Sequence, residues 1–273
     1  MNEAQHNAQA DSLMQALGGG GWIKPSDLAA DLMSDLPAAY RLAAELERRR
    51  VAAGDLPAGW KIGFTNRSIW PRYGVHEPIW GRVWRSTLTL LPGTVADVSL
   101  AGLVQPRIEP EIVFGLAATP DAGMDEEQLR RCIAWVAHGV EIVHTHIEGW
   151  RFHTAAEPVA DFGLHGRLLV GPRCAVDDWV TLGADLAALA MTLYRDDEEV
   201  DRGHGALVLD GPVNALRLGL QALAAQAPAW RVQAGDVVTT GTLTDAWPLS
   251  LGQTWRTAPG DSRLPGLSLS FKA

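Results

Sequence analysis

Cysteine is scarce in this chain, with two residues, Cys132 and Cys174, among 273. Their separation matches no metal-binding motif, so the sequence offers no cysteine-based metal site. Cys132 falls in a helical pattern and Cys174 beside an expected loop. We therefore expect two free, buried thiols, which suits the reducing environment of the cytoplasm.

Long apolar runs are missing as well. No stretch approaches the roughly 18 consecutive apolar residues that a membrane helix needs. The first 20 residues include Glu3 and Asp11 and hold no sustained apolar segment, so we expect no signal peptide. These absences predict a cytoplasmic protein without a membrane partner.

Positive charge is outnumbered, because 23 lysines and arginines stand against 32 aspartates and glutamates, for a net charge of -9. A chain this acidic is not expected to bind nucleic acid or anionic membrane surfaces. An anionic small molecule remains compatible with the sequence, provided that a local cation recruits it.

The remaining composition, 47% apolar and 20% charged residues, is that of an ordinary globular protein. The length allows one large domain or one domain with an appendage. We expect residues 1–273 to form a single domain, with residues 1–55 a helical N-terminal region and residues 56–273 a β-rich core. Within this frame the apolar spacing and the end signals predict helices over residues 5–17, 36 to about 53, 124 or 125 to about 139, and 212 to about 227.

Local signals mark the ends of these helices. The glycine run at residues 18–21 is expected to end the first helix as a flexible joint or a turn. Ser34 or Asp35 can cap the second helix. Residues 73–81 are expected to form a loop because of their glycine and proline content.

Two carboxylates stand two residues apart in residues 106–114, P-R-I-E-P-E-I-V-F. On a strand, Glu109 and Glu111 share a face, and two like charges that close repel each other unless a cation lies between them. A divalent ion such as Mg²⁺ suits this role because it prefers oxygen ligands. The alternative is an edge strand with a solvated acidic face.

A third carboxylate, Glu141, is flanked by apolar residues in a predicted strand at residues 140–147. An acid in such a strand needs a partner. Three oxygen ligands on neighbouring strands would leave an octahedral ion open positions for substrate and water. His144 and His146 could also be ligands, but imidazole suits zinc better, so we expect structural roles for both.

Lys61 is the cation in a short predicted strand at residues 59–65 with otherwise apolar neighbours. A buried lysine shifts its pKa readily enough to act as an acid or a base. The alternative is an edge-strand lysine that reaches the solvent.

Six motifs together resemble the 2-oxo-4-pentenoate hydratases and 4-oxalocrotonate decarboxylases of the fumarylacetoacetate hydrolase superfamily. They occur in that family's order and spacing from about residue 36 to the C-terminus. The motifs are W-K-I-G-F-T at 60–65, P-R-I-E-P-E-I-V-F at 106–114, V-E-I-V at 140–143, P-V-A-D at 158–161, G-P-V-N-A at 211–215 and G-D-V-V-T-T-G-T-L-T at 235–244.

The resemblance implies an α+β fold with a mixed β-roll core and helices outside it. It implies Mg²⁺ or Mn²⁺ on Glu109, Glu111 and Glu141, with Lys61 as the acid/base group. Family members are usually homo-oligomers that act on 2-oxo or 2-hydroxy acids in aromatic catabolism. Asp161 is implied as a substrate-binding residue, and Thr242 or Thr244 could bind the substrate carboxylate, although threonine also simply suits a strand.

The chain departs from the family pattern at two places. Ile79 stands where many members carry an acid, and the small polar run that follows the V-A-D motif is replaced by residues 162–166, F-G-L-H-G. This predicts a more apolar pocket that has gained His165. His165 or His144 could position the water that is added to the substrate; the alternative for each is a packed, hydrogen-bonded histidine.

The expected reaction is hydration of a 2-hydroxy-2,4-dienoate through an enolate stabilised by the metal. The same enolate chemistry serves a decarboxylase, an acylpyruvate C–C hydrolase or an oxaloacetate tautomerase. A non-catalytic relative that binds 2-oxo acids is the alternative from another class of protein.

Overall fold

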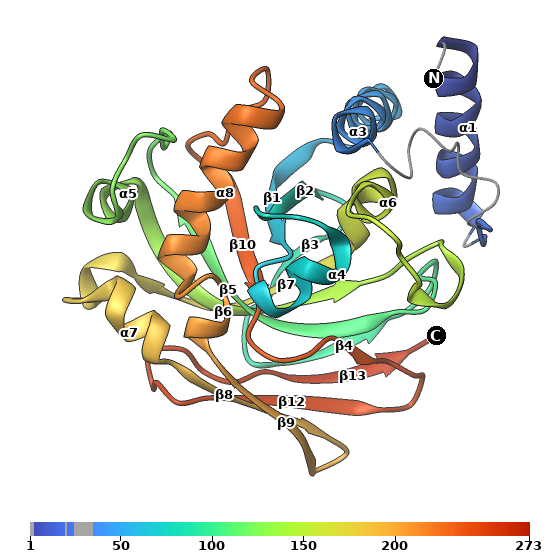
Figure 1. Cartoon of the computed structure of the whole chain (residues 1–273). Helices are drawn as coiled ribbons and strands as arrows, with labels where there is room; N and C mark the ends of the chain where they lie inside the picture. The colour runs from blue at the N-terminus through green and yellow to red at the C-terminus, as the bar shows by residue number, and fades with distance from the viewer. Residues whose placement is uncertain (1–2, 20, 25–34) are drawn as a thin grey trace.

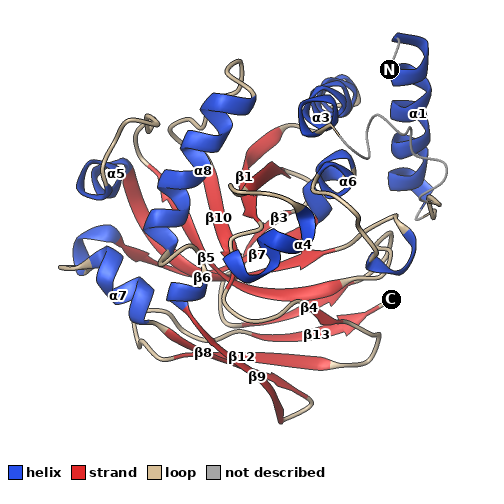
Figure 2. Cartoon of the chain, in the orientation of Figure 1, coloured by secondary structure: helices blue, strands red, loops and turns tan. Residues whose placement is uncertain are grey.

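The computed structural model describes residues 3–19, 21–24 and 35–273, and the strands of this part form two sheets (Figure 1). The large sheet has eight strands and curls, and the small sheet has five. Figure 2 shows the small sheet on one side of the large one, with most of the helices on the other side. The expected α+β fold with a roll-like core is thereby confirmed.

The large sheet has the strand order β2-β1-β10-β5-β6-β7-β3, with β11 paired to β5 beside this path. Its centre is the long antiparallel pair β5–β6, in which Glu109 lies opposite Glu141. The strands are β1 (Pro57–Gly63), β2 (Ile79–Trp84), β3 (Leu88–Leu90), β5 (Arg107–Leu116), β6 (Ile133–Val143), β7 (His165–Ala175), β10 (Val237–Thr242) and β11 (Trp247–Pro248).

The side chains on the inner face of the curled sheet change from apolar to charged along its strands. Every second residue of a strand points to this face. One part is apolar and is formed by the buried residues Val83, Val113, Ala137, Leu168, Val170 and Val237. Two positions before Val113 on β5 lies Glu111, and four positions after Ala137 on β6 lies Glu141. The sheet therefore places a charged group at the end of a packed apolar interior.

The small sheet has the order β4-β13-β12-β8-β9 and packs against the outer face of the large sheet. Ile108, Val140 and Trp255 belong to the apolar cluster between the two sheets. The strands are β4 (Val95–Ser99), β8 (Ala190–Arg195), β9 (Glu198–His204), β12 (Thr254–Pro259) and β13 (Ser268–Lys272).

His138 on β6 links the two sheets by polar contacts. Its Nδ1 lies 3.0 Å from the carbonyl oxygen of Glu111, and its Nε2 lies 2.7 Å from the hydroxyl of Thr257 on β12. A neutral ring that donates from Nδ1 and accepts at Nε2 satisfies both contacts. Burial lowers the pKa of His138 to about 4 despite the backbone contact, so this ring stays neutral at physiological pH.

The helices cover the remaining outer surface (Figure 2). Residues 36–52 and 212–226 are helical as predicted, and Pro212 occupies the first turn of its helix. None of the described helices is both long and apolar enough to cross a membrane. They are α1 (Glu3–Gly19), α3 (Leu36–Ala52), α4 (Trp70–Tyr73), α5 (Glu126–Cys132), α6 (Ala156–Ala160), α7 (Leu182–Ala188) and α8 (Pro212–Gln226).

The prediction of one helix from residue 124 or 125 to about 139 is wrong beyond Cys132. The helix begins with a capping box between Asp125 and Gln128, but the chain becomes β6 at Ile133. Residues 133–143 pair with β5 on one side and with β7 on the other. Backbone pairing on both edges overrides the local helical spacing of the apolar residues.

Three boundary predictions also change. The first helix runs to Gly19, past the start of the glycine run, and Gly20 lies outside the described residues. Asp35 occupies the N-cap position of α3 but makes no capping hydrogen bond, and Ser34 lies outside the described residues. Residues 79–81, predicted as loop, begin β2 because they pair with β1.

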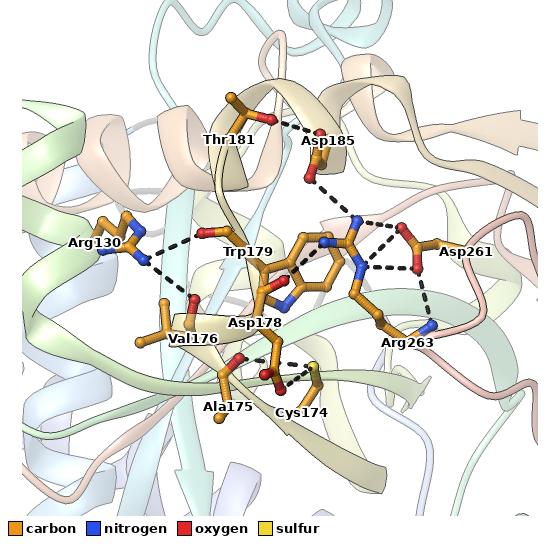
Figure 3. Close-up of polar contacts among 10 residues, drawn as sticks. All are labelled: Arg130, Cys174, Ala175, Val176, Asp178, Trp179, Thr181, Asp185, Asp261 and Arg263. Atoms are coloured by element: carbon orange, nitrogen blue, oxygen red, sulfur yellow. Dashed lines mark hydrogen bonds and ion pairs between the residues drawn. The ribbon is translucent and has the colours of Figure 1, made fainter.

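Figure 3 shows how the C-terminal segment is fastened to α7 through Arg263. The guanidinium donates to Asp185 at 3.1 Å and to Asp261 at 2.6 Å. It also lies 3.7 Å from the centre of the Trp179 ring. Cys174 lies below this group in Figure 3. Cys174 and Cys132 are both free thiols, as predicted, but Cys132 alone of the two is buried, because Cys174 is partly exposed.

Candidate active site

Three carboxylates from β5 and β6 converge on the inner face of the large sheet. Glu109 and Glu111 point the same way by strand alternation, and Glu141 lies opposite Glu109 in the antiparallel register. One oxygen from each of the three carboxylates lies within 4.8 Å of the other two. Glu111 and Glu141 are fully buried, whereas Glu109 is half-buried and lines a cavity.

A bulge in β10 orients the Glu111 carboxylate. The register between β10 and β5 shifts between Thr239 and Thr242, which aims the Gly241 amide at Glu111 Oε2 over 2.7 Å. The hydroxyl of Thr239 donates to the same oxygen. Gly241 has a φ of +102°, and a Cβ there would lie 2.0 Å from Thr65 Oγ1, so glycine is required at this position.

His165 orients the Glu141 carboxylate from the other side. Its Nδ1 lies 2.7 Å from Glu141 Oε1, and its Nε2 lies 2.7 Å from Thr87 Oγ1. Burial first, and then the charge of Lys61, lower the pKa of His165 well below its ordinary value. A neutral ring that donates to Glu141 and accepts the hydroxyl proton of Thr87 satisfies the chain of contacts.

Two carboxylate oxygens are left over by this network. Glu111 Oε1 is buried and accepts no hydrogen bond from the described residues. Glu141 Oε2 is buried too and accepts no hydrogen bond from these residues, and the Lys61 ammonium lies 3.5 Å from it. Buried anionic oxygens without donors are costly, and a hard divalent cation is the partner that such a set of oxygens fits.

Lys61 on β1 completes the charged group, and its side chain is 5% exposed. Burial alone would lower the pKa of Lys61, but the charges of Glu141, Glu109 and Glu111 outweigh burial and raise the pKa above its ordinary value. The ammonium is therefore charged in the metal-free protein. A divalent ion among the carboxylates would weaken this effect because it neutralises the same charges.

The carboxylates themselves are hard to ionise without a metal. Burial, with the charge of Glu141 adding to it, raises the pKa of Glu111 to about 8. Burial also raises the pKa of Glu109 to about 8, although Lys61 opposes the shift. The pKa of Glu141 is raised by burial as well.

These shifts predict a pH-dependent stability for the metal-free protein. An acid whose pKa is higher in the folded than in the unfolded state favours folding below the unfolded value and loses that contribution as the pH rises through the folded value. With chelator present, the melting temperature of the wild type relative to that of Glu111→Gln should fall as the pH rises from about 4.5 to about 8, because the buried histidines affect both proteins alike. Thermal unfolding of the wild type and of Glu111→Gln, with chelator and with Mg²⁺, checks this. A fall that is equally steep in the variant would contradict it.

A cavity of about 540 Å³ opens above the charged group. Lys61 and Glu109 line it, and so do Thr242 and Thr244, for which the sequence predicts contact with the substrate. Ile79 also lines it, so at this departure from the family pattern the wall of the cavity is apolar, beside charged lining residues such as Arg107.

Other predicted residues lie away from the lining of this cavity. The Asp161 carboxylate is buried and accepts hydrogen bonds from the Thr145 hydroxyl and from the backbone and ring of His146. His144 accepts the backbone N–H of Val104 at 3.3 Å. His165 uses both ring nitrogens within the protein, as described above. The roles of Asp161 in substrate binding and of His165 or His144 in positioning water stay predictions.

Sequence reasoning missed several residues of the site. Thr239 and Gly241 lie in the motif at residues 235–244, but nothing in the sequence marks them individually as contacts of Glu111. Thr87 is distant in sequence from the other residues of the site. Arg107 lines the cavity and had a usable signal, because it lies two residues before Glu109 and so on the same face of the strand.

Comparison with solved structures defines the fold. No family profile matches the chain. The structure superposes with a TM-score of 0.88 on 4-oxalocrotonate decarboxylase from Pseudomonas putida G7, complexed with magnesium and adipate, at 24% identity and over 99% of this chain and 98% of that one. Fumarylpyruvate hydrolase from Pseudomonas aeruginosa, complexed with Mn²⁺ and pyruvate, superposes with a TM-score of 0.58 over 78% and 88% of the two chains, at 14% identity. The fold is that of the fumarylacetoacetate hydrolase superfamily.

Proteins of similar sequence identify the family to which the chain belongs. The chain is 30% identical to 2-hydroxyhexa-2,4-dienoate hydratase of Comamonas testosteroni over 78% of each protein. It is 31% identical to 2-keto-4-pentenoate hydratase of Paraburkholderia phymatum over 77% of this chain and 76% of that protein. The chain belongs to the family of 2-keto-4-pentenoate hydratases and 4-oxalocrotonate decarboxylases, as its motifs indicated.

Proposed function

We propose that the protein is a metal-dependent hydro-lyase that adds water to a 2-hydroxy-2,4-dienoate. The observation that carries the proposal is the pair of buried carboxylate oxygens without donors, on Glu111 and Glu141, next to the Lys61 ammonium and beneath the cavity. The names of the relatives support a hydratase. We propose Mg²⁺ or Mn²⁺ as the ion, held by Glu109, Glu111 and Glu141.

The residues of the chain divide the work as follows. The ion, when bound, acts as a Lewis acid toward the 2-hydroxy acid end of the substrate. Lys61 moves protons at the substrate: overall the enol proton is lost, C5 gains a proton, and the conjugated 2-oxo acid results. Water then adds its hydroxyl at C4 and a proton at C3, which gives a 4-hydroxy-2-oxo acid. Ile79 and the other apolar lining residues hold the carbon chain and restrict access of bulk water.

Decarboxylation is the second candidate, and the cavity lining favours it in one respect. Arg72 and Arg151 line the cavity and are exposed, which provides cations for a second carboxylate at the far end of a substrate. An unsaturated 2-oxo dicarboxylate would lose its distal carboxylate as CO₂.

The test follows the loss of dienoate absorbance of 2-hydroxypenta-2,4-dienoate with Mg²⁺ and with chelator, and identifies the product by NMR. Metal-dependent formation of 4-hydroxy-2-oxopentanoate is the expected result. Absence of turnover while oxalate and Mg²⁺ still bind would overturn the hydratase proposal in favour of the decarboxylase, the acylpyruvate hydrolase or the tautomerase. Absence of both would favour a protein without this enzyme activity.

We also propose that His165 is a positioning residue for Glu141. Replacing His165 by alanine removes the donor to Glu141 Oε1, and we expect Mg²⁺ affinity to fall by about 10- to 100-fold, as for other partners of metal ligands. His165→Asn, whose amide can donate, should recover part of the affinity. Isothermal titration with Mg²⁺ measures the effect. Wild-type affinity in a folded His165→Ala protein would refute it.

The assembly and location of the protein are proposals of the same kind. We propose a homo-oligomer in the cytoplasm, with the whole chain as one catalytic domain. Light scattering coupled to size exclusion measures the mass against the 29.4 kDa of one chain.

A further inference from the structure

The charges of the site leave the substrate without a counter-ion. If the proposed function holds, three ionised carboxylates face a divalent ion and the Lys61 ammonium, and these charges cancel. A 2-oxo or 2-hydroxy acid then brings an additional carboxylate into a partly buried place. Such a charge needs a cation or several hydrogen-bond donors to replace its water.

Arg107 lies where this cation is needed. It precedes Glu109 by two residues on β5, so both side chains lie on the same face of the strand, and both line the cavity. Although both residues are described, Arg107 and Glu109 form no direct ion pair with each other, and their charges interact over a longer distance. Arg107 is half-buried, whereas the cavity arginines Arg72 and Arg151 are exposed.

The guanidinium of Arg107 is held in place but keeps free donors. It stacks over the Trp150 ring, with 4.3 Å from its central carbon to the ring centre. Its one hydrogen bond within the described residues is a long contact of 3.4 Å from Nη1 to the carbonyl oxygen of Ala246. A guanidinium has five N–H donors, so most of its donors remain available to a ligand in the cavity.

The aromatic platform is itself fixed by the backbone. The Trp150 indole N–H donates to the carbonyl oxygen of Gln105 at 2.9 Å. The Gln105 side chain donates to the carbonyl oxygens of Thr145 and Ile147 and accepts the N–H of Gly149. Trp150 has a φ of +56°, a strained value for a bulky residue that these contacts hold in place. The stacked Arg107 is thus pre-organised.

We propose that Arg107 is the carboxylate-binding residue of the site and donates hydrogen bonds to the C1 carboxylate of the 2-oxo or 2-hydroxy acid substrate. The Trp150 platform keeps the guanidinium in the orientation that this contact needs. A planar fork of donors matches a carboxylate better than an ammonium does. This proposal rests on the proposed function for the nature of the ligand, but it concerns binding and can be tested without turnover.

The test is isothermal titration of pyruvate and of oxalate into protein saturated with Mg²⁺. Arg107→Gln should bind both ligands about 10- to 100-fold more weakly than the wild type, which is the usual effect of losing charged hydrogen bonds. The affinity of Arg107→Lys should lie between those of the wild type and Arg107→Gln, because lysine keeps the positive charge but lacks the planar pair of donors. The control is Arg256→Gln, an arginine that stacks on Tyr194 in the small sheet at 3.9 Å and should bind as the wild type does.

The outcomes separate this proposal from the proposed function. The carboxylate-binding role of Arg107 would be overturned if Arg107→Gln bound pyruvate and oxalate as tightly as the wild type does. It would also be overturned if this variant lost Mg²⁺ affinity by the same factor as it lost affinity for pyruvate and oxalate. A loss seen with adipate but not with pyruvate would overturn it too, since Arg107 would then bind a distal carboxylate. A protein that fails to hydrate the dienoate but loses pyruvate binding on Arg107→Gln would refute the hydratase and support the carboxylate contact.

Discussion

Replacing Glu109 by alanine is expected to abolish metal-dependent turnover, with a fall in kcat/KM of at least about a thousand-fold. The substitution removes one of the three carboxylates proposed to hold the ion. Glu109 is the better choice for this test than Glu111, because Glu111 also accepts hydrogen bonds from Thr239 and Gly241 that support β10. The expected loss therefore reports on the ion and the substrate instead of the packing of the sheet.

Turnover with Mg²⁺ and with chelator, beside Mg²⁺ titration, measures the effect of Glu109→Ala. Glu198→Gln provides the matched control, because Glu198 is an exposed acid on the edge strand β9 of the small sheet. It should leave both activity and Mg²⁺ affinity unchanged. Activity that survives in Glu109→Ala, or that survives chelation in the wild type, would refute the proposal that a metal ion bound by these carboxylates is needed for turnover.

Lys61→Ala is expected to lower kcat by about a hundred- to ten-thousand-fold, the usual contribution of a positioned acid/base group. Mg²⁺ binding should remain, because the carboxylates are intact and lose a competing cation. Lys61→Met should behave in the same way while it fills the space of the buried side chain. The split between a large loss of kcat and retained metal affinity is the signature of a proton-transfer role.

Single-turnover kinetics and Mg²⁺ titration of the two Lys61 variants make the measurement. Lys272→Ala is the control, since Lys272 is an exposed lysine on β13 that pairs with Asp97. An unchanged kcat in a folded Lys61→Met protein would demote Lys61 to a structural role. Loss of Mg²⁺ binding together with activity would mean that Lys61 holds the site together instead of transferring protons.

Two strand segments were predicted wrongly, one as a helix and one as a loop, and both errors have the same physical cause. Residues 133–139 have the spacing of a helix, yet they form β6 because strands lie on both sides of them. Residues 79–81 contain glycine and follow a proline, yet they form β2 because β1 offers its free edge. In both places pairing with a distant strand decides the conformation, and single-sequence periodicity contains no information about that partner.

The sequence by itself determined the parts of the site that depend on local geometry. Strand alternation put Glu109 and Glu111 on one face, and the same rule would have included Arg107. The six motifs pointed to the family and its fold, and the comparisons confirmed both. These conclusions need no knowledge of which strands are neighbours.

Only the tertiary structure decided which distant residues meet. The antiparallel register sets Glu141 opposite Glu109, and the curl of the sheet brings Lys61 to 3.5 Å from Glu141. The fold also assigns His165 to Glu141 and closes Trp150 over Arg107. Strand order, register and loop packing are set by the burial of the whole chain, so no local pattern determines them.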